Sequence, residues 1–260
     1  MKTASRYFML FSVVLFLGCV ASATAQSKST SNVMGPENVS FPSGTETVHG
    51  VLYRPQAAGS FPAIVIIHEW WGLNDWVKQQ AQMFAEHGYV TLAVDLYRGQ
   101  VATDPEMAHE LMRALPQDRG VGYLRSGVAY LKTLKYVKAN RIGAAGWCMG
   151  GSFAMQLAVA EPSLKAVAIN YGAPESDPAQ LKKIHAAILG NFGAQDRGIT
   201  PKDVADFAAA MKSIGHPVDV KEYPDAGHAF QNPNNKAGYR PEDTADADSR
   251  MFAFFAEYLK

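Results

Sequence analysis

The sequence contains little cysteine, with Cys19 and Cys148 as the two cysteines in 260 residues. Two cysteines allow at most one disulfide, so a small scaffold held together by several disulfides is excluded. If the segment that contains Cys19 is removed as part of a signal peptide, the mature chain has a single cysteine and no intramolecular disulfide. A lone thiol in an oxidising compartment is prone to oxidation, so a catalytic need explains Cys148 better than chance does.

The sequence also lacks an excess of charge of either sign. Its 24 lysines and arginines balance its 24 aspartates and glutamates, and no run of basic residues occurs. This distribution argues against the basic surfaces that bind nucleic acids or anionic membranes, so we expect neither partner. Repeats and low-complexity tracts are missing as well, and the length is sufficient for one large domain.

No hydrophobic run is long enough to span a membrane comfortably. The apolar stretch Tyr7–Leu17 follows a short basic segment and is shorter than the roughly 20 residues that a membrane helix needs. Ala23–Ala25 has the A-x-A pattern of a signal peptidase site. We therefore predict a signal peptide over residues 1–25, cleaved after Ala25, and a periplasmic or secreted mature protein. Lipoprotein processing at Cys19 is the alternative, and only lipidation there would give stable membrane association.

From residue 61 onward, strand-like and helix-like patterns alternate. Continuous apolar runs such as Ala63–Ile67 are typical of central parallel strands that are covered on both faces. Thr47–Tyr53 and the turn before it predict an antiparallel N-terminal hairpin. Residues 26–38 are rich in Ser, Thr and Asn and predict a flexible lead-in. Residues 39–260 then form a single α/β domain, with a mostly parallel central sheet and helices on both faces.

The same patterns give approximate bounds for the individual elements. Strands are expected at 47–53, 63–67, 89–94, 141–146, 166–171, 186–192 and 218–223, the last of them at an edge of the sheet. Helices are expected at 75–87, 105–115, 120–134, 150–161, 202–214 and 243–259.

The most informative motif is Gly146–Gly150, which has the form G-x-C-x-G between a predicted strand and a predicted helix. It matches the nucleophile elbow of α/β-hydrolases, with cysteine in place of serine. Glycines are needed there because the strand and the helix pass very close to each other. The N–H groups at the start of the helix favour a thiolate. Cys148 is therefore the candidate nucleophile; a structural cysteine beside a glycine-rich turn is the alternative.

A cysteine nucleophile needs a base and a group that orients the base. His228 lies in a glycine-containing loop after the last predicted strand, where open α/β sheets place their ligands. His68 is its closest rival, because it ends a central strand. Asp196 directly follows the strand 186–192 and gives the order nucleophile, acid, histidine. Asp225 is the alternative acid.

Several separated motifs now resemble one family. The order Cys148, Asp196, His228 and the segments His68–Gly72 and Asp95–Arg98 look like the dienelactone hydrolase family of α/β-hydrolases, from about Val39 to the C-terminus. The segment Gly227-His-Ala-Phe230 and the phenylalanine-rich closing helix fit the same family.

The resemblance implies further roles. Glu69 corresponds to a glutamate that contacts the resting thiol and helps to generate the thiolate. The backbone N–H groups of Trp70 and Met149 correspond to the oxyanion hole, and Arg98 to an arginine that binds the substrate carboxylate. Members specific for dienelactones carry a serine after the histidine and a second arginine further along. Ala229 and Asn232 stand at those two positions here, so half of the carboxylate clamp is missing.

The leading hypothesis is a hydrolase that cleaves a small-molecule ester, lactone or thioester through a Cys-His-Asp triad and an acyl-enzyme, resembling a carboxymethylenebutenolidase. It implies no metal and no organic cofactor, and a monomer is expected. A non-catalytic small-molecule-binding protein with the same fold is the first alternative, and a peptidase is the second. The natural substrate stays open.

Overall fold

The computed structural model describes Met1 and residues 32–260. The predicted signal peptide, its cleavage site and the alternative lipidation site at Cys19 lie outside these residues. Within the described part of the chain, no helix combines the length and the hydrophobicity that crossing a membrane would require.

The centre of the fold is an eight-stranded sheet with the order β1-β2-β4-β3-β5-β6-β7-β8. The strands are β1 (Val33–Ser43), β2 (Glu46–Pro55), β3 (Phe61–Ile67), β4 (Val90–Val94), β5 (Val137–Trp147), β6 (Ala166–Asn170), β7 (Ala187–Gly193) and β8 (Val218–Tyr223). The β1–β2 and β2–β4 pairs are antiparallel, whereas all other pairs are parallel. The predictions of an N-terminal hairpin, a mostly parallel sheet and an edge position for β8 are therefore confirmed.

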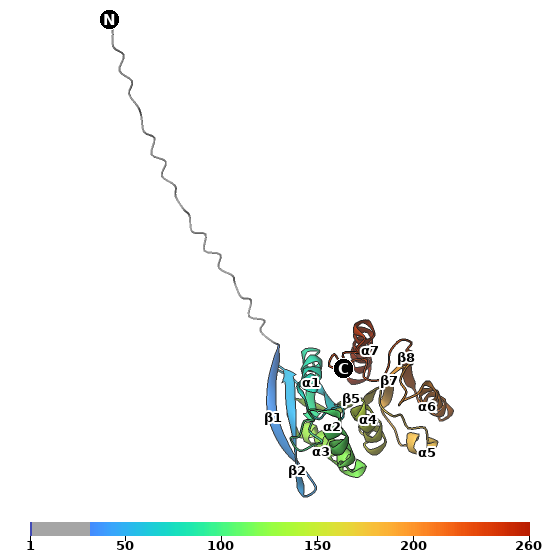
Figure 1. The fold of residues 1–260 in the computed structure, drawn as a ribbon. Helices are drawn as coiled ribbons and strands as arrows, with labels where there is room; N and C mark the ends of the chain where they lie inside the picture. The colour runs from blue at the N-terminus through green and yellow to red at the C-terminus, as the bar shows by residue number, and fades with distance from the viewer. Residues whose placement is uncertain (2–31) are drawn as a thin grey trace. The chain divides into compact units, whose positions relative to one another are not determined.

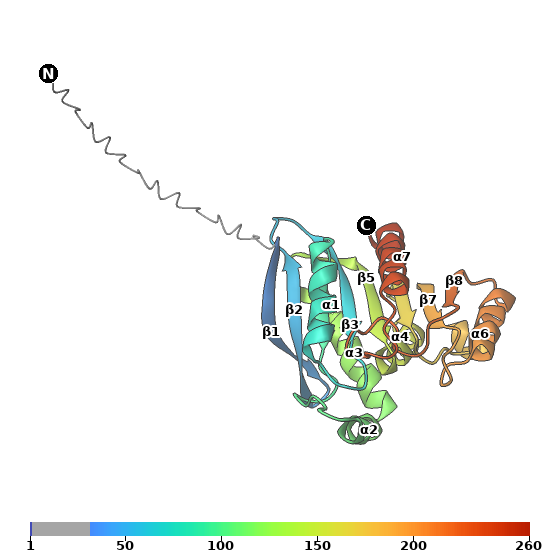
Figure 2. The same ribbon diagram turned by 45° about the horizontal axis from the view of Figure 1, so that its top comes forward.

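Helices cover both faces of this sheet (Figures 1 and 2). They are α1 (Asp75–Glu86), α2 (Pro105–Arg113), α3 (Gln117–Thr133), α4 (Met149–Ala160), α5 (Pro178–Leu181), α6 (Pro201–Ser213) and α7 (Pro241–Leu259). Buried side chains of α3, α4 and α6 pack in one apolar core, and those of α1 and α7 pack in the other. The buried strand β3 supplies both cores, because Val65 faces the first and Ile66 faces the second.

Several boundaries differ from the predictions; β5, for example, begins at Val137 rather than at residue 141. β1 begins at Val33, so Val33–Asn38 belong to a strand rather than to the expected lead-in. Backbone pairing with β2 draws these residues into the sheet, although their mostly exposed side chains give no alternating pattern. Helix α3 begins at Gln117, directly after Pro116, rather than at residue 120. Its first turn is polar and faces solvent, so it adds nothing to the apolar periodicity that predicted the helix. The four-residue helix α5 was not predicted, since so short a segment carries no periodicity.

The carboxyl ends of the parallel strands β3, β5, β7 and β8 all lie at the same end of the sheet. The segments after these strands carry Glu69, Cys148, Asp196 and His228. Residues that are up to 163 positions distant in the sequence, such as Glu69 and Asn232, therefore reach one another.

Candidate active site

Cys148 lies at the apex of the sharp turn between β5 and α4, where it is the N-cap of α4. Its φ of 54° and ψ of −120° are strained for a residue with a side chain. The neighbouring glycines are required by the close approach that this turn imposes. A Cβ on Gly146 would lie 2.0 Å from the carbonyl oxygen of Gly150, and a Cβ on Gly150 would lie 2.3 Å from the carbonyl oxygen of Ile67.

Two buried asparagines support the turn from the adjacent strands. The amide of Asn191 in β7 donates to Oδ1 of Asn170 in β6 at 2.8 Å, and Nδ2 of Asn170 donates to the carbonyl of Gly146 at 3.1 Å. The backbone N–H of Cys148 donates to the carbonyl of Asn170 at 3.0 Å. These asparagines are fully buried in strands that are otherwise apolar. Their role was not predicted, and a polar residue within an apolar strand pattern is the signal that could have indicated it.

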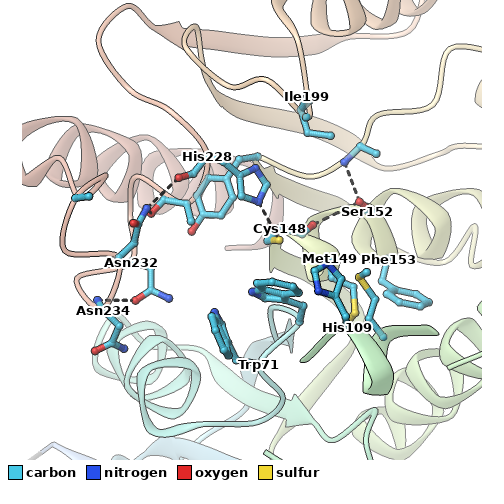
Figure 3. Close-up of a pocket in the computed structure, with 18 of the residues that line it drawn as sticks. Trp71, His109, Cys148, Met149, Ser152, Phe153, Ile199, His228, Asn232 and Asn234 are labelled. Atoms are coloured by element: carbon cyan, nitrogen blue, oxygen red, sulfur yellow. Dashed lines mark hydrogen bonds between the residues drawn. The ribbon is translucent and has the colours of Figure 1, made fainter. Parts of the chain in front are cut away.

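The structure brings Cys148, His228 and Asp196 into one hydrogen-bonded chain. Nε2 of His228 lies 3.0 Å from Sγ of Cys148, and Nδ1 of His228 lies 2.6 Å from Oδ2 of Asp196 (Figure 3). Burial alone would lower the pKa of His228, but its hydrogen bonds to Asp196 and Cys148 and the charges of both raise the pKa to about 10. A protonated imidazole at this position favours the thiolate form of Cys148.

Asp196 is fixed by its own turn. Its Oδ1 accepts hydrogen bonds from the backbone N–H groups of Gly198 at 2.8 Å and Ile199 at 3.1 Å. Burial alone would raise the pKa of Asp196, but the hydrogen bond with His228, these backbone bonds and the imidazolium charge together lower it. Asp196 thus stays a carboxylate and holds the imidazole with Nε2 facing the sulfur. The alternative acid, Asp225, is exposed and is not the carboxylate that His228 contacts.

His68, the rival histidine, has a structural role. It is fully buried, its Nδ1 donates to the carbonyl of Glu69 at 2.6 Å, and its Nε2 accepts from the N–H of Leu96 at 3.2 Å. Burial lowers the pKa of His68. With both ring nitrogens engaged by the backbone, His68 fixes the segment after β3 that carries Glu69.

Glu69 is buried beside this chain of three residues but does not hydrogen-bond to the sulfur. Its Oε1 accepts from the hydroxyl of Tyr171 at 3.2 Å, and its Oε2 accepts from Nδ2 of Asn232 at 2.6 Å. Burial raises the pKa of Glu69 to about 7, although both hydrogen bonds and the charge of His228 act in the opposite direction. In this arrangement the hydrogen-bonding partner of Sγ is His228, and the expected role of Glu69 toward the resting thiol stays a prediction.

Asn232 stands where a second arginine was expected, and the structure gives it a partner of its own. It is buried and donates to Glu69. Sequence reasoning missed this partnership because the two residues lie on distant segments. Tyr171, the second partner of Glu69, was also missed; its φ of 39° places its buried ring against His228 at 5.4 Å between centroids.

Two backbone N–H groups of residues that line the cavity have no partner among the residues that the structure describes. The N–H of Met149 is at the first position of α4, and the N–H of Trp70 follows Glu69 after β3. Neither donates to another group in residues 32–260. Both residues line the same cavity as Cys148. Unpaired N–H groups beside a nucleophile are the arrangement that stabilises an oxyanion.

The sulfur opens into a cavity of about 1090 Å³. Figure 3 shows His228 above Cys148, Trp71 below them, and Met149 and Phe153 to the right of Cys148. The cavity wall includes several further apolar or aromatic residues, among them Trp70, Met112, Tyr171 and Ile199. A site of this size and character suits an organic molecule rather than an isolated ion.

Arg98 lies outside this cavity. Nε of Arg98 donates to the hydroxyl of Tyr123 at 3.1 Å, and its guanidinium also contacts the carboxylate of Glu46. It is not among the residues that line the space in front of Cys148. Glu46 at the start of β2 and Tyr123 in α3 hold the side chain of Arg98 there, and its predicted contact with a substrate carboxylate stays a prediction.

Within residues 32–260, no group of three or more His, Cys, Asp or Glu side chains is arranged to hold a metal ion. The polar side chains around the sulfur are instead hydrogen-bonded to one another, from His228 to Asp196 and from Asn232 and Tyr171 to Glu69.

The sequence profile of the dienelactone hydrolase family matches residues 48–259. The chain belongs to the dienelactone hydrolase family. "Protein usf" of Aquifex pyrophilus is 31% identical to it over 228 residues, which are 85% of this chain and 98% of that protein. A protein of Aquifex aeolicus named "Putative carboxymethylenebutenolidase" is 29% identical over 229 residues, which are 85% of this chain and 98% of the relative.

A solved structure shows the same likeness. The crystal structure of a "Putative Dienelactone Hydrolase" from Klebsiella pneumoniae superposes with a TM-score of 0.79 at 26% identity, covering 87% of this chain and 99% of that one. The α/β-hydrolase fold and the family resemblance expected from the sequence are thus confirmed. This family member is a carboxylic ester hydrolase.

Proposed function

We propose that this dienelactone hydrolase family member cleaves its ester, lactone or thioester with Cys148 as nucleophile, His228 as acid and base, and Asp196 as the group that orients His228. The observation that carries the proposal is the continuous hydrogen-bonded chain from Sγ of Cys148 through the imidazole to Asp196. The strained elbow and the unpaired N–H groups of Trp70 and Met149 support it.

In the first half-reaction, the thiolate of Cys148 attacks the carbonyl carbon while Nε2 of His228 carries the thiol proton. The carbonyl oxygen becomes an oxyanion, which accepts hydrogen bonds from the N–H groups of Trp70 and Met149. The carbon–oxygen bond to the leaving alcohol then breaks, or the carbon–sulfur bond of a thioester breaks. His228 gives its proton to the departing atom, and Cys148 is left as a thioester.

In the second half-reaction, water replaces the alcohol. His228 removes a proton from water as the water oxygen attacks the thioester carbonyl, and the same two N–H groups hold the second oxyanion. The carbon–sulfur bond breaks, the carboxylic acid leaves, and the proton on His228 again faces the thiolate. Asp196 keeps its negative charge throughout, because its role is to hold the imidazole orientation and stabilise its protonated form.

Glu69 assists through His228 rather than by touching the sulfur. When ionised, its buried carboxylate attracts the imidazolium, an interaction that is mutual and that also lowers the pKa of Glu69. A Glu69→Gln variant removes that charge and keeps the size of the side chain. We expect a lower rate of thiol alkylation at neutral pH in this variant, with little change at high pH, where the thiolate forms without help.

We further propose that the enzyme acts in the periplasm or outside the cell, on small molecules rather than nucleic acids or membranes. The proposal rests on the signal-peptide pattern of residues 1–25 and on the balanced charge of the chain. N-terminal sequencing of the exported protein tests it: a terminus at Gln26 supports it, whereas a lipid-modified Cys19 or an uncleaved Met1 contradicts it.

The direct test is hydrolysis of small activated esters by the mature protein and by Cys148→Ala. The proposal expects turnover that falls by about 10³-fold or more in the variant. Full activity in Cys148→Ala would overturn the nucleophile assignment. Absence of turnover on esters, lactones and thioesters would favour a binding protein, and cleavage of peptides alone would favour a peptidase.

A further inference from the structure

The cavity in front of Cys148 has a continuous apolar side. We call the side chains of Trp70, Trp71, His109, Met112 and Phe153 the aromatic wall; all of them line the cavity. The rings of Trp70 and Trp71 meet edge to face with centroids 5.0 Å apart, and His109 stands edge to face on Trp70 at 4.7 Å. Fixed aromatic surfaces of this kind stabilise an apolar or aromatic group by burying it.

The groups that would bind a carboxylate are not available to this cavity. Arg98 is held by Glu46 and Tyr123 outside the cavity. Asn232 lines the cavity, but its amide donates to Glu69 at 2.6 Å. The paired arrangement that would grip an anionic substrate is therefore missing at both positions.

The charges that remain offer little to an anion, because the imidazolium of His228, which lines the cavity, is already paired with Asp196 and the thiolate of Cys148. The cavity lining contains no aspartate or glutamate among the described residues, and its lysine is Lys236, an exposed residue of the loop that follows His228. An exposed lysine binds a carboxylate weakly, because water screens the pair. Behind the lining, Glu69 is bonded to the hydroxyl of Tyr171 and repels a second carboxylate when ionised.

From these observations we infer the substrate class. We propose that the enzyme takes uncharged esters or lactones whose larger group is aromatic and packs on the aromatic wall, and that it discriminates against substrates that carry a carboxylate. The inference rests on the proposed function, because it concerns the substrate of the same site. A carboxylate entering this cavity loses hydration without gaining an unpaired cation as partner, since the imidazolium of His228 is paired with Asp196 and Cys148, and this loss is costly.

The first experiment compares two esters that differ in one charge. 4-Nitrophenyl hydrogen adipate carries a free carboxylate, and 4-nitrophenyl methyl adipate has the same chain with that carboxylate methylated. Release of 4-nitrophenolate is followed at about pH 8, where the hydrogen adipate is fully ionised, and enzyme-independent release is subtracted. We expect kcat/KM for the methylated ester to be higher by roughly tenfold or more. Equal values, or a preference for the free carboxylate, would overturn the inference.

Variants identify the groups responsible. Lys236→Ala should leave kcat/KM for both adipates within about threefold; a selective loss with the free carboxylate would make Lys236 an anion site and overturn the inference. Trp71→Ala should raise KM for benzyl acetate by roughly 5- to 30-fold and change that for ethyl acetate little, with acid release followed by titration. Trp71→Phe should retain most of the binding. Equal effects of Trp71→Ala on both esters would contradict the role of the aromatic wall.

A binding measurement separates this inference from the proposed function. Cys148→Ala is titrated with each adipate, and quenching of tryptophan fluorescence is measured. Tighter binding of the methylated ester supports the inference even if the nucleophile assignment fails, whereas equal or reversed binding overturns it. Conversely, hydrolysis that survives in Cys148→Ala overturns the proposed function without changing the ratio of affinities.

Discussion

Asn232 donates a 2.6 Å hydrogen bond to Oε2 of Glu69, so a neutral amide is the closest partner of a buried carboxyl group. The other partner, the hydroxyl of Tyr171, is neutral as well. Hydrogen bonds without a paired positive charge compensate only part of the cost of burying a carboxylate. The raised pKa of Glu69, about 7, is a consequence of that burial.

This burial predicts how stability depends on pH. The pKa of Glu69 is higher in the folded protein than its usual 4.5. Below that value Glu69 is protonated in both the folded and the unfolded protein, so its burial as a carboxylate does not lower the free energy of unfolding there. As pH rises from about 4.5 through 7, the unfolded state loses its proton first and the folded protein becomes destabilised relative to it. Glu69→Gln removes this effect. We expect its melting temperature to rise relative to that of the parent protein as the pH of the measurement increases from about 5 to 8.

The matched control is Glu86→Gln, which changes an exposed glutamate at the end of α1. Its melting temperature relative to the parent should show no comparable trend with pH. A Glu69→Gln difference that stays constant across the same range would contradict a raised pKa at this site.

The hydrogen bond between Asp196 and His228 predicts the reactivity of the sulfur. The raised pKa of His228, about 10, keeps the imidazolium next to Cys148 over the neutral range. Asp196→Asn removes the charge while retaining the shape of the side chain, so the pKa of His228 should fall. We expect alkylation of Cys148 by iodoacetamide near neutral pH to slow by roughly tenfold or more. We also expect kcat to fall by about 10²- to 10⁴-fold.

Alkylation should slow rather than accelerate because an imidazolium stabilises the thiolate and a neutral imidazole does not. Mass spectrometry of the alkylated protein as a function of time gives the rate, and Asp225→Asn serves as control because Asp225 does not contact His228. Equal alkylation rates in Asp196→Asn and in the parent protein would show that Asp196 does not control the state of His228.

The elbow predicts a sharp contrast between two glycines. A Cβ on Gly150 would lie 2.3 Å from the carbonyl oxygen of Ile67 and 2.6 Å from that of His68, so the backbone must shift. We expect Gly150→Ala to lower the free energy of unfolding by about 3 kcal/mol or more. Gly122 lies within α3, where a Cβ would have no neighbouring atom within 4 Å, so Gly122→Ala should stabilise by about 0.5–1 kcal/mol. Urea denaturation of both variants measures the contrast; similar effects would contradict the tight packing at the elbow.

Much of this fold was predictable because its signals are local. The apolar run Ala63–Ile67 is strand β3, and the glycines around Cys148 mark the turn into α4. Asn74 caps α1, as expected, by accepting from the N–H of Val77. The positions of Cys148, Asp196 and His228 along the chain also predicted that they meet at the carboxyl ends of the strands, since the loops after parallel strands lie on the same side.

The remaining features depend on contacts between distant segments. Nothing near Asn232 in the sequence indicates Glu69, and nothing near Arg98 indicates that Glu46 holds it. Residues 33–38 are a similar case, because their strand is defined by pairing with β2 rather than by their own side chains. Sequence patterns predict where helices and strands begin and end. The partners of polar side chains, in contrast, can be identified only once the distant segments are packed together.

The central claim is that Cys148 becomes acylated during turnover, and one measurement tests it most directly. The protein is mixed with an excess of 4-nitrophenyl acetate, quenched in acid within the first turnovers, digested and analysed by mass spectrometry. We predict an acetyl group on the peptide that contains Cys148, formed at the rate of the initial burst of 4-nitrophenolate, and no such adduct or burst in Cys148→Ala. An acetyl group on another residue at that rate, or an unchanged burst in Cys148→Ala, would contradict the account.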